Sequence, residues 1–165
     1  MPGFAIRAAT DADTPQILSF IEALQAYEHG LEPNRRRDSS FAEEHLAVLN
    51  RQLATQQGCA FLAQSGAAAI GWAAFYVVES DIFIVEAERR HGYIAELYVV
   101  EDWRGKGVGR ALMAACEAET RALDLPLITI NVLAGNKNAA MRYVEAGFAP
   151  YATELRKYLK GPQKP

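Results

Sequence analysis

Residues 93–112, YIAELYVVEDWRGKGVGRAL, join an alternating apolar strand to a glycine-rich loop that opens a helix. The first backbone N–H groups of a helix have no intrahelical partners and lie at the positive end of the helix dipole, so they attract oxyanions. Three glycines in the loop let a ligand approach the backbone, and three cationic side chains accompany them. These residues are Gly105, Gly107 and Gly109, with Arg104, Lys106 and Arg110. The stretch predicts a cradle for an anionic cofactor.

Two familiar phosphate-binding motifs do not fit this loop. A Walker loop requires Ser or Thr after Gly-Lys, whereas Gly107 follows Lys106 here. A dinucleotide fingerprint requires G-x-G-x-x-G, whereas this loop contains G-x-G-x-G. By itself the loop also fits an ordinary helix-entry turn, so a second motif is needed.

The second motif lies downstream. Residues 127–133, LITINVL, are typical of a buried strand, and the frame N-x-x-A-x-x-x-Y-x-x-x-G-F follows from Asn136 through Tyr143 to Phe148. Together with R-x-x-G-x-G beginning at Arg104, this frame resembles the GCN5-related N-acetyltransferase (GNAT) superfamily in order and spacing. The resemblance spans nearly the whole chain, from a strand at residues 4–8 to a strand at residues 153–159.

The resemblance implies an α/β (α+β) fold in one N-acetyltransferase domain over residues 1–165. Its twisted sheet would be mixed but mostly antiparallel, with six to seven strands and about four flanking helices. Acetyl-coenzyme A (acetyl-CoA) would be the cosubstrate, with no metal, and its pantetheine arm would lie between two splayed strands. The resemblance assigns cofactor contacts to Leu97, Tyr98, Val99, Arg104, Gly105, Lys106, Gly107, Val108, Gly109, Arg110 and Asn136.

Transfer of an acetyl group to an amine requires a base for the ammonium proton and an acid for the leaving thiolate. Tyr143 resembles the family's general acid, although a tyrosine on an amphipathic helix also fits simple packing. Glu96 is the candidate base, and alternation places its side chain on the face of Tyr98, opposite Leu97. A solvated strand residue is the other interpretation of Glu96, and Glu79 is a weaker candidate base.

The N-terminal segment indicates a substrate class. The pattern FxIRxATxADxxxILxxIxxLxxYE over residues 4–28 resembles the diamine and spermidine acetyltransferase branch, in which Tyr27 and Glu28 would help to hold a cationic substrate. The chain departs from that branch, because Ala95 precedes Glu96 where the branch has two acidic residues. The segment 80–92 is also longer and carries Arg89 and Arg90, which would repel a polyamine if they faced the cleft. A basic amino acid or derivative fits as well as a polyamine.

Two other functions stay open at the level of sequence. One is a peptide or protein N-acetyltransferase, which would need an open groove instead of a closed pocket. The other is a CoA-binding sensor that binds the cofactor without turnover. The family leads us to expect a homodimer, with the strand at residues 153–159 as a candidate interface.

Composition limits the remaining choices. The 165 residues are half hydrophobic, enough for one core, and the net charge of −3 argues against a nucleic-acid partner. The run from Arg35 to Arg37 fits a solvated turn. The N-terminus lacks a signal peptide and no segment could span a membrane, so we expect a cytoplasmic protein with no membrane partner. Cys59 and Cys116 lack the spacing of a zinc site and fit reduced packing residues.

Periodicity and capping signals predict the secondary structure. Thr14 and Pro15 open a first helix to about Glu28, with Gly30 as a stop, and Ser40 with Glu43 forms a capping box for a second helix. A hairpin of residues 60–64 and 67–78 turns at residues 65–66, and residues 81–90 are expected as a strand-edge loop. Later elements are expected as a strand at 93–100, a helix at about 107–123, a strand at 127–133 and a helix at about 138–146.

Overall fold

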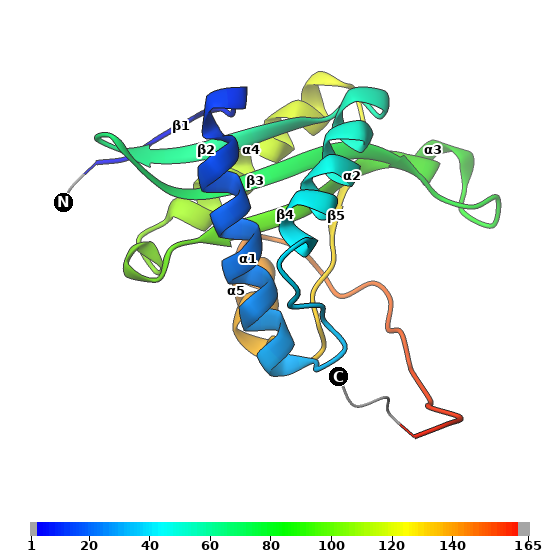
Figure 1. Ribbon diagram of the computed structural model, residues 1–165. Helices are drawn as coiled ribbons and strands as arrows, with labels where there is room; N and C mark the ends of the chain where they lie inside the picture. The colour runs from blue at the N-terminus through cyan, green and yellow to red at the C-terminus, as the bar shows by residue number, and fades with distance from the viewer. Residues whose placement is uncertain (1–2, 162–165) are drawn as a thin grey trace.

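A twisted five-stranded sheet forms the centre of the computed structural model, which describes residues 3–161 (Figure 1). The strand order is β1-β2-β3-β4-β5, and all neighbours are antiparallel except β4 and β5, which are parallel. The strands are β1 (Ala5–Ala8), β2 (Cys59–Ser65), β3 (Ala68–Glu79), β4 (Arg90–Val99) and β5 (Ile128–Ile130). The helices are α1 (Thr14–Leu31), α2 (Phe41–Thr55), α3 (Glu86–Arg89), α4 (Val108–Ala122) and α5 (Lys137–Glu145), with 3₁₀ turns η1 (Asp11–Asp13) and η2 (Glu101–Trp103).

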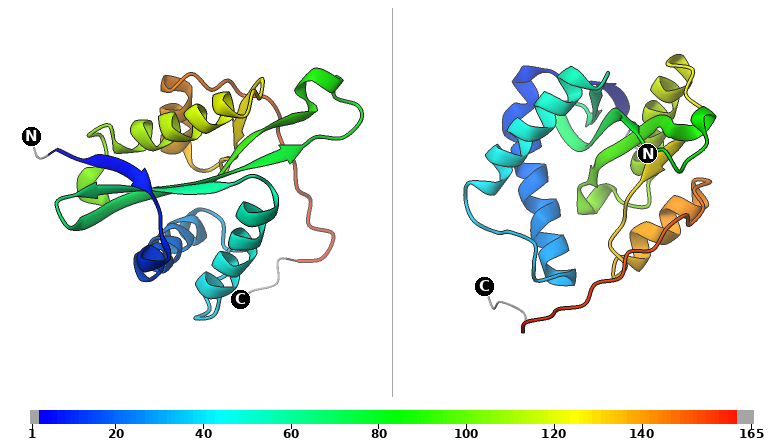
Figure 2. Two further views of the ribbon diagram at one scale, coloured as in Figure 1. Left: turned by 90° about the horizontal axis from the view of Figure 1, so that it is seen from above. Right: turned by 90° about the vertical axis from the view of Figure 1, so that its right-hand side faces the viewer.

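Helices cover both faces of the sheet, α1 and α2 on one side and α4 and α5 on the other (Figure 2). The core is accordingly divided into two layers. The layer under α1 and α2 contains Phe20, Leu49 and Trp72, whereas the layer under α4 contains Phe75 and Leu112. None of the helices within residues 3–161 is both long and apolar enough to cross a membrane.

Helix α4 shows why local pattern predicted this part of the fold well. Its buried residues recur at helical spacing and face the sheet. They are Val108, Leu112, Met113, Cys116 and Thr120. Cys116 is fully buried, and burial raises the pKa of its thiol to about 12, as expected for a packing residue and not for a nucleophile.

The predicted hairpin is confirmed. Strands β2 and β3 pair in antiparallel register from Cys59 opposite Phe75 to Ser65 opposite Ala68. The turn between them contains Gly66 with φ of +57°, a left-handed conformation that glycine adopts without a Cβ penalty.

The predicted strand count is too high. The sheet has five strands instead of six to seven, and five α-helices accompany it because the segment 80–92 contains the single-turn helix α3. The last expected strand, residues 153–159, has no regular secondary structure. Alternation of apolar residues is a local signal, whereas a strand also needs a partner edge, and β5 ends after three residues.

Element boundaries also shift. Helix α1 continues through Gly30 to Leu31, and β4 begins at Arg90 instead of residue 93. The capping box predicted for α2 is absent. Ser40 occupies the N-cap but makes no cap bond, because its single hydroxyl proton can be donated to either of two nearby carboxylates, those of Asp38 and Glu44. Arg36 also binds both carboxylates, and this network diverts the Ser40 hydroxyl from the helix end.

Candidate functional site

The edge of β4 is open beyond its first residues. Strand β5 pairs with Gly92, Tyr93 and Ile94 and ends at Ile130, so the later residues of β4 have no partner strand on this side among the described residues. The N–H of Val100 donates to the carbonyl of Ile70 on β3. Because neighbouring residues of a strand direct their N–H groups to opposite edges, the amides of Val99 and Leu97 face the side vacated by β5. An extended ligand could pair with this edge as an added strand.

A β-bulge interrupts β4 where this pairing ends. Ala74 of β3 pairs with Glu96 and Phe75 pairs with Ile94, so Ala95 is an extra residue in β4. Bulges bend the strand that carries them and are frequent beside functional sites. The bulge lies directly after Ile94, the last residue of β4 that pairs with β5.

The glycine loop joins the end of this edge to α4. Gly107 is the N-cap of α4, with φ of +86°, and the first helical bond runs from the N–H of Ala111 to the carbonyl of Gly107. The amides of Val108, Gly109 and Arg110 therefore have no helical acceptors. A Cβ added at Gly107 would meet no atom within 4 Å, so the loop presents open space to a ligand. These features fit a phosphate-bearing group.

The cations of the loop take different positions. The Nε of Arg104 donates to the carbonyl of Val99 at 3.0 Å, and its guanidinium lies 5.8 Å from the centre of the Tyr98 ring. The ammonium of Lys106 lies 5.3 Å from the centre of the Trp103 ring. Arg110 is exposed on the first turn of α4. Arg104 thus links the loop to the open edge of β4.

The end of α1 meets the start of α5. Asn136 caps α5, its Oδ1 accepting from the N–H of Ala139 at 3.1 Å. The hydroxyl of Tyr27 donates to the same oxygen at 3.3 Å. Two residues predicted for different roles, substrate binding and cofactor binding, therefore lie in contact although they are 109 positions apart.

Tyr143 lies on α5 against the α4 layer of the core. Its ring packs 6.2 Å from that of Phe148. Burial, with a smaller contribution from the negative charge of Glu28, raises the pKa of the Tyr143 phenol to about 12. The phenol is therefore protonated throughout the neutral range, as an acid must be before it donates.

A pair of titratable side chains lies on the α1 and α2 side of β4. The Nε2 of His45 lies 2.6 Å from Oε1 of Glu96, and the negative charge of Glu28 contributes to a raised pKa of His45. Tyr98 packs on Phe20 on the same face, so Glu96 and Tyr98 share a face as alternation predicted. His45 was not predicted. It directly precedes the buried Leu46, at the margin of the inner face of α2, and only this position hinted at a role.

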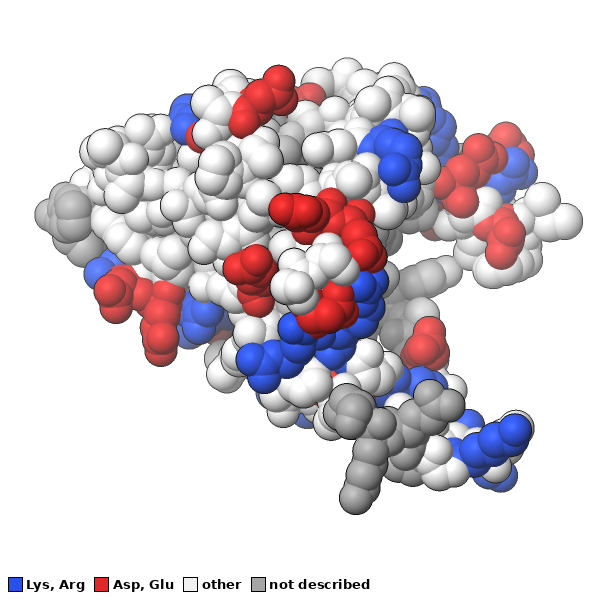
Figure 3. Space-filling model, viewed as in Figure 1, with Lys and Arg blue, Asp and Glu red and all other residues white. Residues whose placement is uncertain are grey.

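The interpretation of the basic run 35–37 as a solvated turn is wrong for Arg35. Its Nε lies 3.2 Å from Oε2 of Glu28, so Arg35 belongs to the candidate site instead of a solvated turn. Arg36 instead binds acidic residues at the surface, and charges of both signs alternate over this part of the molecule (Figure 3).

Other candidate residues lie apart from the site. Glu79 pairs across the β3–β4 ladder with Arg90, whereas the site lies near Ala74 and Glu96. Arg89 binds Glu79 and Glu86, and Arg90 donates to Gln57. These arginines are therefore bound to neighbouring side chains at the end of the sheet remote from the glycine loop.

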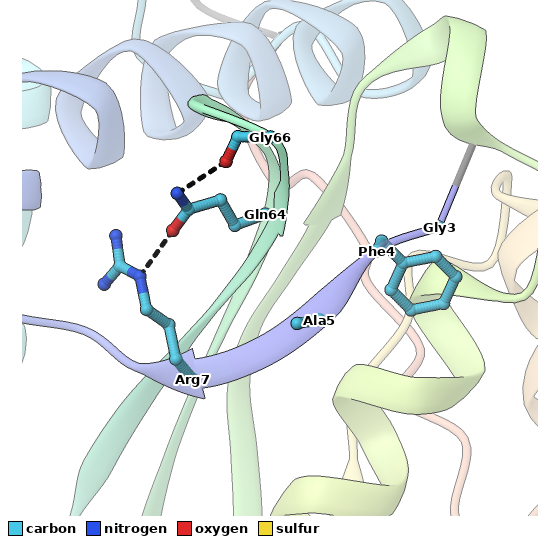
Figure 4. Close-up of a pocket in the computed structure, with 6 residues that line it drawn as sticks. All are labelled: Gly3, Phe4, Ala5, Arg7, Gln64 and Gly66. Carbon is cyan, nitrogen blue, oxygen red and sulfur yellow. Dashed lines mark hydrogen bonds between the residues drawn. The ribbon is translucent and has the colours of Figure 1, made fainter.

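A surface hollow of about 420 Å³ lies elsewhere, between the start of β1 and the β2–β3 turn (Figure 4). Its polar groups bind each other, because Arg7 donates to Gln64 and Gln64 donates to the carbonyl of Gly66. Arg7 also forms an ion pair with Asp13. The hollow offers little polar chemistry to a ligand. Among the described residues, no cluster of three or more His, Cys, Asp or Glu side chains could hold a metal ion.

Comparison with known proteins identifies a family. A profile of the Acetyltransferase (GNAT) family matches residues 20–148. No curated protein sequence matches the chain significantly.

Solved structures share the fold. A GCN5-related N-acetyltransferase from Ralstonia eutropha is 22% identical with a TM-score of 0.73, covering 95% of this chain and 99% of that one. An aminoglycoside 6′-N-acetyltransferase from Acinetobacter haemolyticus is 18% identical with a TM-score of 0.71, covering 94% and 98%. An aminoglycoside acetyltransferase from an uncultured soil sample is 19% identical with a TM-score of 0.65, covering 95% of each chain. At these identities the likeness shows the fold and leaves the substrate undecided.

Proposed function

The chain belongs to the Acetyltransferase (GNAT) family, and on that premise we propose that it transfers the acetyl group of acetyl-CoA to a primary amine of a small molecule by direct attack in a ternary complex. The observation that carries the proposal is the junction of the open β4 edge with the glycine loop at the start of α4. This junction offers unpaired amides first to an extended arm and then to phosphates.

Acetyl-CoA would supply the activated acetyl thioester. The amides of Leu97 and Val99 would bind its pantetheine arm and orient the thioester, and amides from Gly105 to Arg110 would bind phosphate oxygens. Asn136, already the cap of α5, would contact the arm. The backbone N–H and C=O groups of Tyr98 point toward β3, so Tyr98 would contribute to cofactor binding through its ring, which lies against the guanidinium of Arg104.

Tyr143 would donate its phenolic proton to the departing thiolate sulfur. The raised pKa supports this role, because the hydroxyl keeps its proton until the leaving group needs it. Glu96 would accept the proton of the substrate ammonium, directly or through water. Its carboxylate lies on a half-buried face beside Glu28, where a cationic substrate is attracted.

We propose a substrate with more than one cationic group, with Tyr27 and Glu28 holding the amine that does not react. Arg35 now balances the charge of Glu28, and a substrate ammonium could take its place. Diamines, polyamines such as spermidine and basic amino acids satisfy this requirement, and so do aminoglycosides, the substrates named for two proteins of the same fold. Arg89 and Arg90 are bound to other side chains, which removes one argument against a polyamine.

The test is release of free thiol from acetyl-CoA across a panel of diamines, polyamines, basic amino acids, aminoglycosides and short peptides. Tyr143→Phe is compared with Tyr151→Phe, which removes a hydroxyl from an exposed tyrosine. Turnover on one amine class, lost only in Tyr143→Phe, supports the proposal. Turnover confined to peptides would favour a peptide or protein N-acetyltransferase. Acetyl-CoA binding without thiol release from any amine would favour a CoA-binding sensor.

We further propose a single domain over residues 1–165 that acts as a cytoplasmic homodimer. Two apolar side chains four positions apart in the segment 153–159 are almost fully exposed, and a second copy could cover them. They are Leu155 and Leu159, at 90% and 88% exposure. Light scattering that gives a monomer mass at micromolar concentration would refute the dimer, and limited proteolysis that yields two stable fragments would refute the single domain.

A further inference from the structure

The pair of His45 and Glu96 connects a buried carboxylate to the solvent. The Glu96 side chain is 10% exposed and the His45 side chain is 33% exposed, and the two are joined by the 2.6 Å contact between Oε1 and Nε2. His45 stacks on Phe41, with ring centres 5.3 Å apart and planes 16° apart. The stacking holds the imidazole with Nε2 against Glu96, while a third of the side chain stays accessible to solvent.

The charges around His45 favour its protonated form. The hydrogen bond with Glu96 raises the His45 pKa above its usual value, the negative charge of Glu28 adds to this effect, and burial opposes it. Burial and the charge of Glu96 raise the pKa of Glu28, while Arg35 and His45 lower it.

Two tyrosines also lie close enough to Glu96 to be affected by its charge. Tyr76 on β3 and Tyr93 on β4 are neutral groups whose phenol pKa values are raised, chiefly by burial. Among the described residues that carry charge, His45 is therefore influenced by Glu96 from β4 and Glu28 from α1, and Arg35 balances Glu28 from the loop after α1.

We propose that His45 is a positioning and proton-relay residue, which orients the Glu96 carboxylate and carries to solvent the proton that Glu96 removes from the substrate amine. This inference rests on the acetyltransferase activity and the role of Glu96 proposed above. In this proposal the general base consists of two residues, Glu96 and His45. The pair explains how the Glu96 carboxylate, whose side chain is 10% exposed, loses its proton again between turnovers.

The proton balance is simple. Before reaction Glu96 is ionised and the His45 ring is neutral, with its proton on Nδ1 and Nε2 free to accept. The N–H bond of the substrate ammonium breaks, and its proton passes through the Glu96 carboxyl to Nε2, which leaves a carboxylate and an imidazolium across the Oε1–Nε2 contact. Nδ1 then releases its proton to water, which leaves a neutral ring protonated on Nε2. Exchange of ring protons with water, uptake at Nδ1 and loss from Nε2, restores the starting tautomer, and no electrons are transferred.

The kinetic test is the pH dependence of kcat with both substrates saturating, in the wild type and in His45→Gln. Because the neutral ring is needed, the wild-type rate should fall as the pH drops through the raised pKa of His45. His45→Gln has no imidazole at this position that must be neutral, so this acid limb should move to lower pH. The plateau should fall at least 10-fold, and the KM for the amine should change less than twofold. The matched control is His91→Gln, because His91 bonds only the carbonyl of Arg89 among the described residues and should keep the wild-type limb.

A second test does not depend on activity. Titration of the His45 ring by NMR in the free protein should give a pKa above the usual value, and Glu96→Gln should lower it. If acetyl transfer occurs but the acid limb of His45→Gln does not move, or if Glu96→Gln leaves the His45 pKa unchanged, the relay is refuted. If no amine supports thiol release, the proposed function fails and the relay fails with it, even where NMR confirms the pair.

Discussion

Replacement of Gly107 by alanine separates the cost of strain from the cost of a damaged phosphate cradle. Gly107 has φ of +86°, and Gly66 in the β2–β3 turn has φ of +57°. At both positions an added Cβ would meet no atom within 4 Å, so the two substitutions share backbone strain and create no clash. Each should destabilise the fold by about 1–2 kcal/mol, the cost of a left-handed conformation for a residue with a Cβ. For a domain of this size that cost lowers Tm by roughly 2–8 °C.

Only Gly107→Ala should weaken acetyl-CoA binding. Relief of the strain would shift φ at Gly107 and turn the amides of Val108 and Gly109 away from the phosphates. Loss of one hydrogen bond to a charged group costs about 1.5–3 kcal/mol, which corresponds to roughly a 10- to 100-fold increase in Kd. Calorimetric titration with acetyl-CoA, beside thermal unfolding of both variants, measures the two effects separately. Equal Kd values for wild type and Gly107→Ala, or equal weakening by Gly66→Ala, would refute the cradle.

Three further variants test the site and the fold. Tyr143→Phe should lower kcat about 100-fold or more at pH 8 with little change in Tm. Because the pKa of the Tyr143 phenol is about 12, the wild-type rate should show no alkaline loss from this group below about pH 11. A pH–rate profile of both proteins checks both expectations. Gly71→Ala should lower the unfolding free energy by about 1–3 kcal/mol in urea titrations, because the new Cβ would lie 2.7 Å from the Tyr98 carbonyl oxygen. Hydrogen bonding to Arg7 lowers the pKa of Asp13 far below the ordinary value of a carboxyl group, so Asp13→Asn should reduce stability at pH 7. The difference from wild type should begin to shrink as the pH falls below about 4, and it should vanish only when the pH falls below the depressed pKa of Asp13.

The parts of the fold predicted correctly are those encoded by local sequence. The loop before α4 needs glycine for its φ angles and apolar residues at helical spacing after it, and both signals lie within one short segment. The β2–β3 hairpin is similar, because Gly66 and the flanking alternation occur together. The family frame assigned Asn136 to cofactor binding, which stays a prediction, and the structure shows that Asn136 caps α5.

The parts missed depend on contacts between distant segments. His45 reaches Glu96 from 51 positions away, and Arg35 reaches Glu28 only because the chain reverses after α1. A capping box is a local rule, but Arg36 recruits the acidic neighbours of Ser40 and changes the outcome. No periodicity in one segment can indicate such partners, since each depends on how α1 and α2 pack on the sheet.

Strand β4 explains why the candidate site forms where it does. With Ala95 as the extra residue, Ala95 and Glu96 both lie on the side of α1 and α2, whereas Leu97 and Val99 return to the side of α4. Pairing with β5 ends at Ile94, directly before the bulge, and this leaves the Leu97 and Val99 amides free for an extended ligand. One strand thus directs a carboxylate toward the end of α1, where Glu28 lies, and presents backbone donors along its open edge. An amine that approaches from the α1 side and a thioester held along that edge would meet at β4, and this convergence is the geometry that direct transfer between two bound substrates requires.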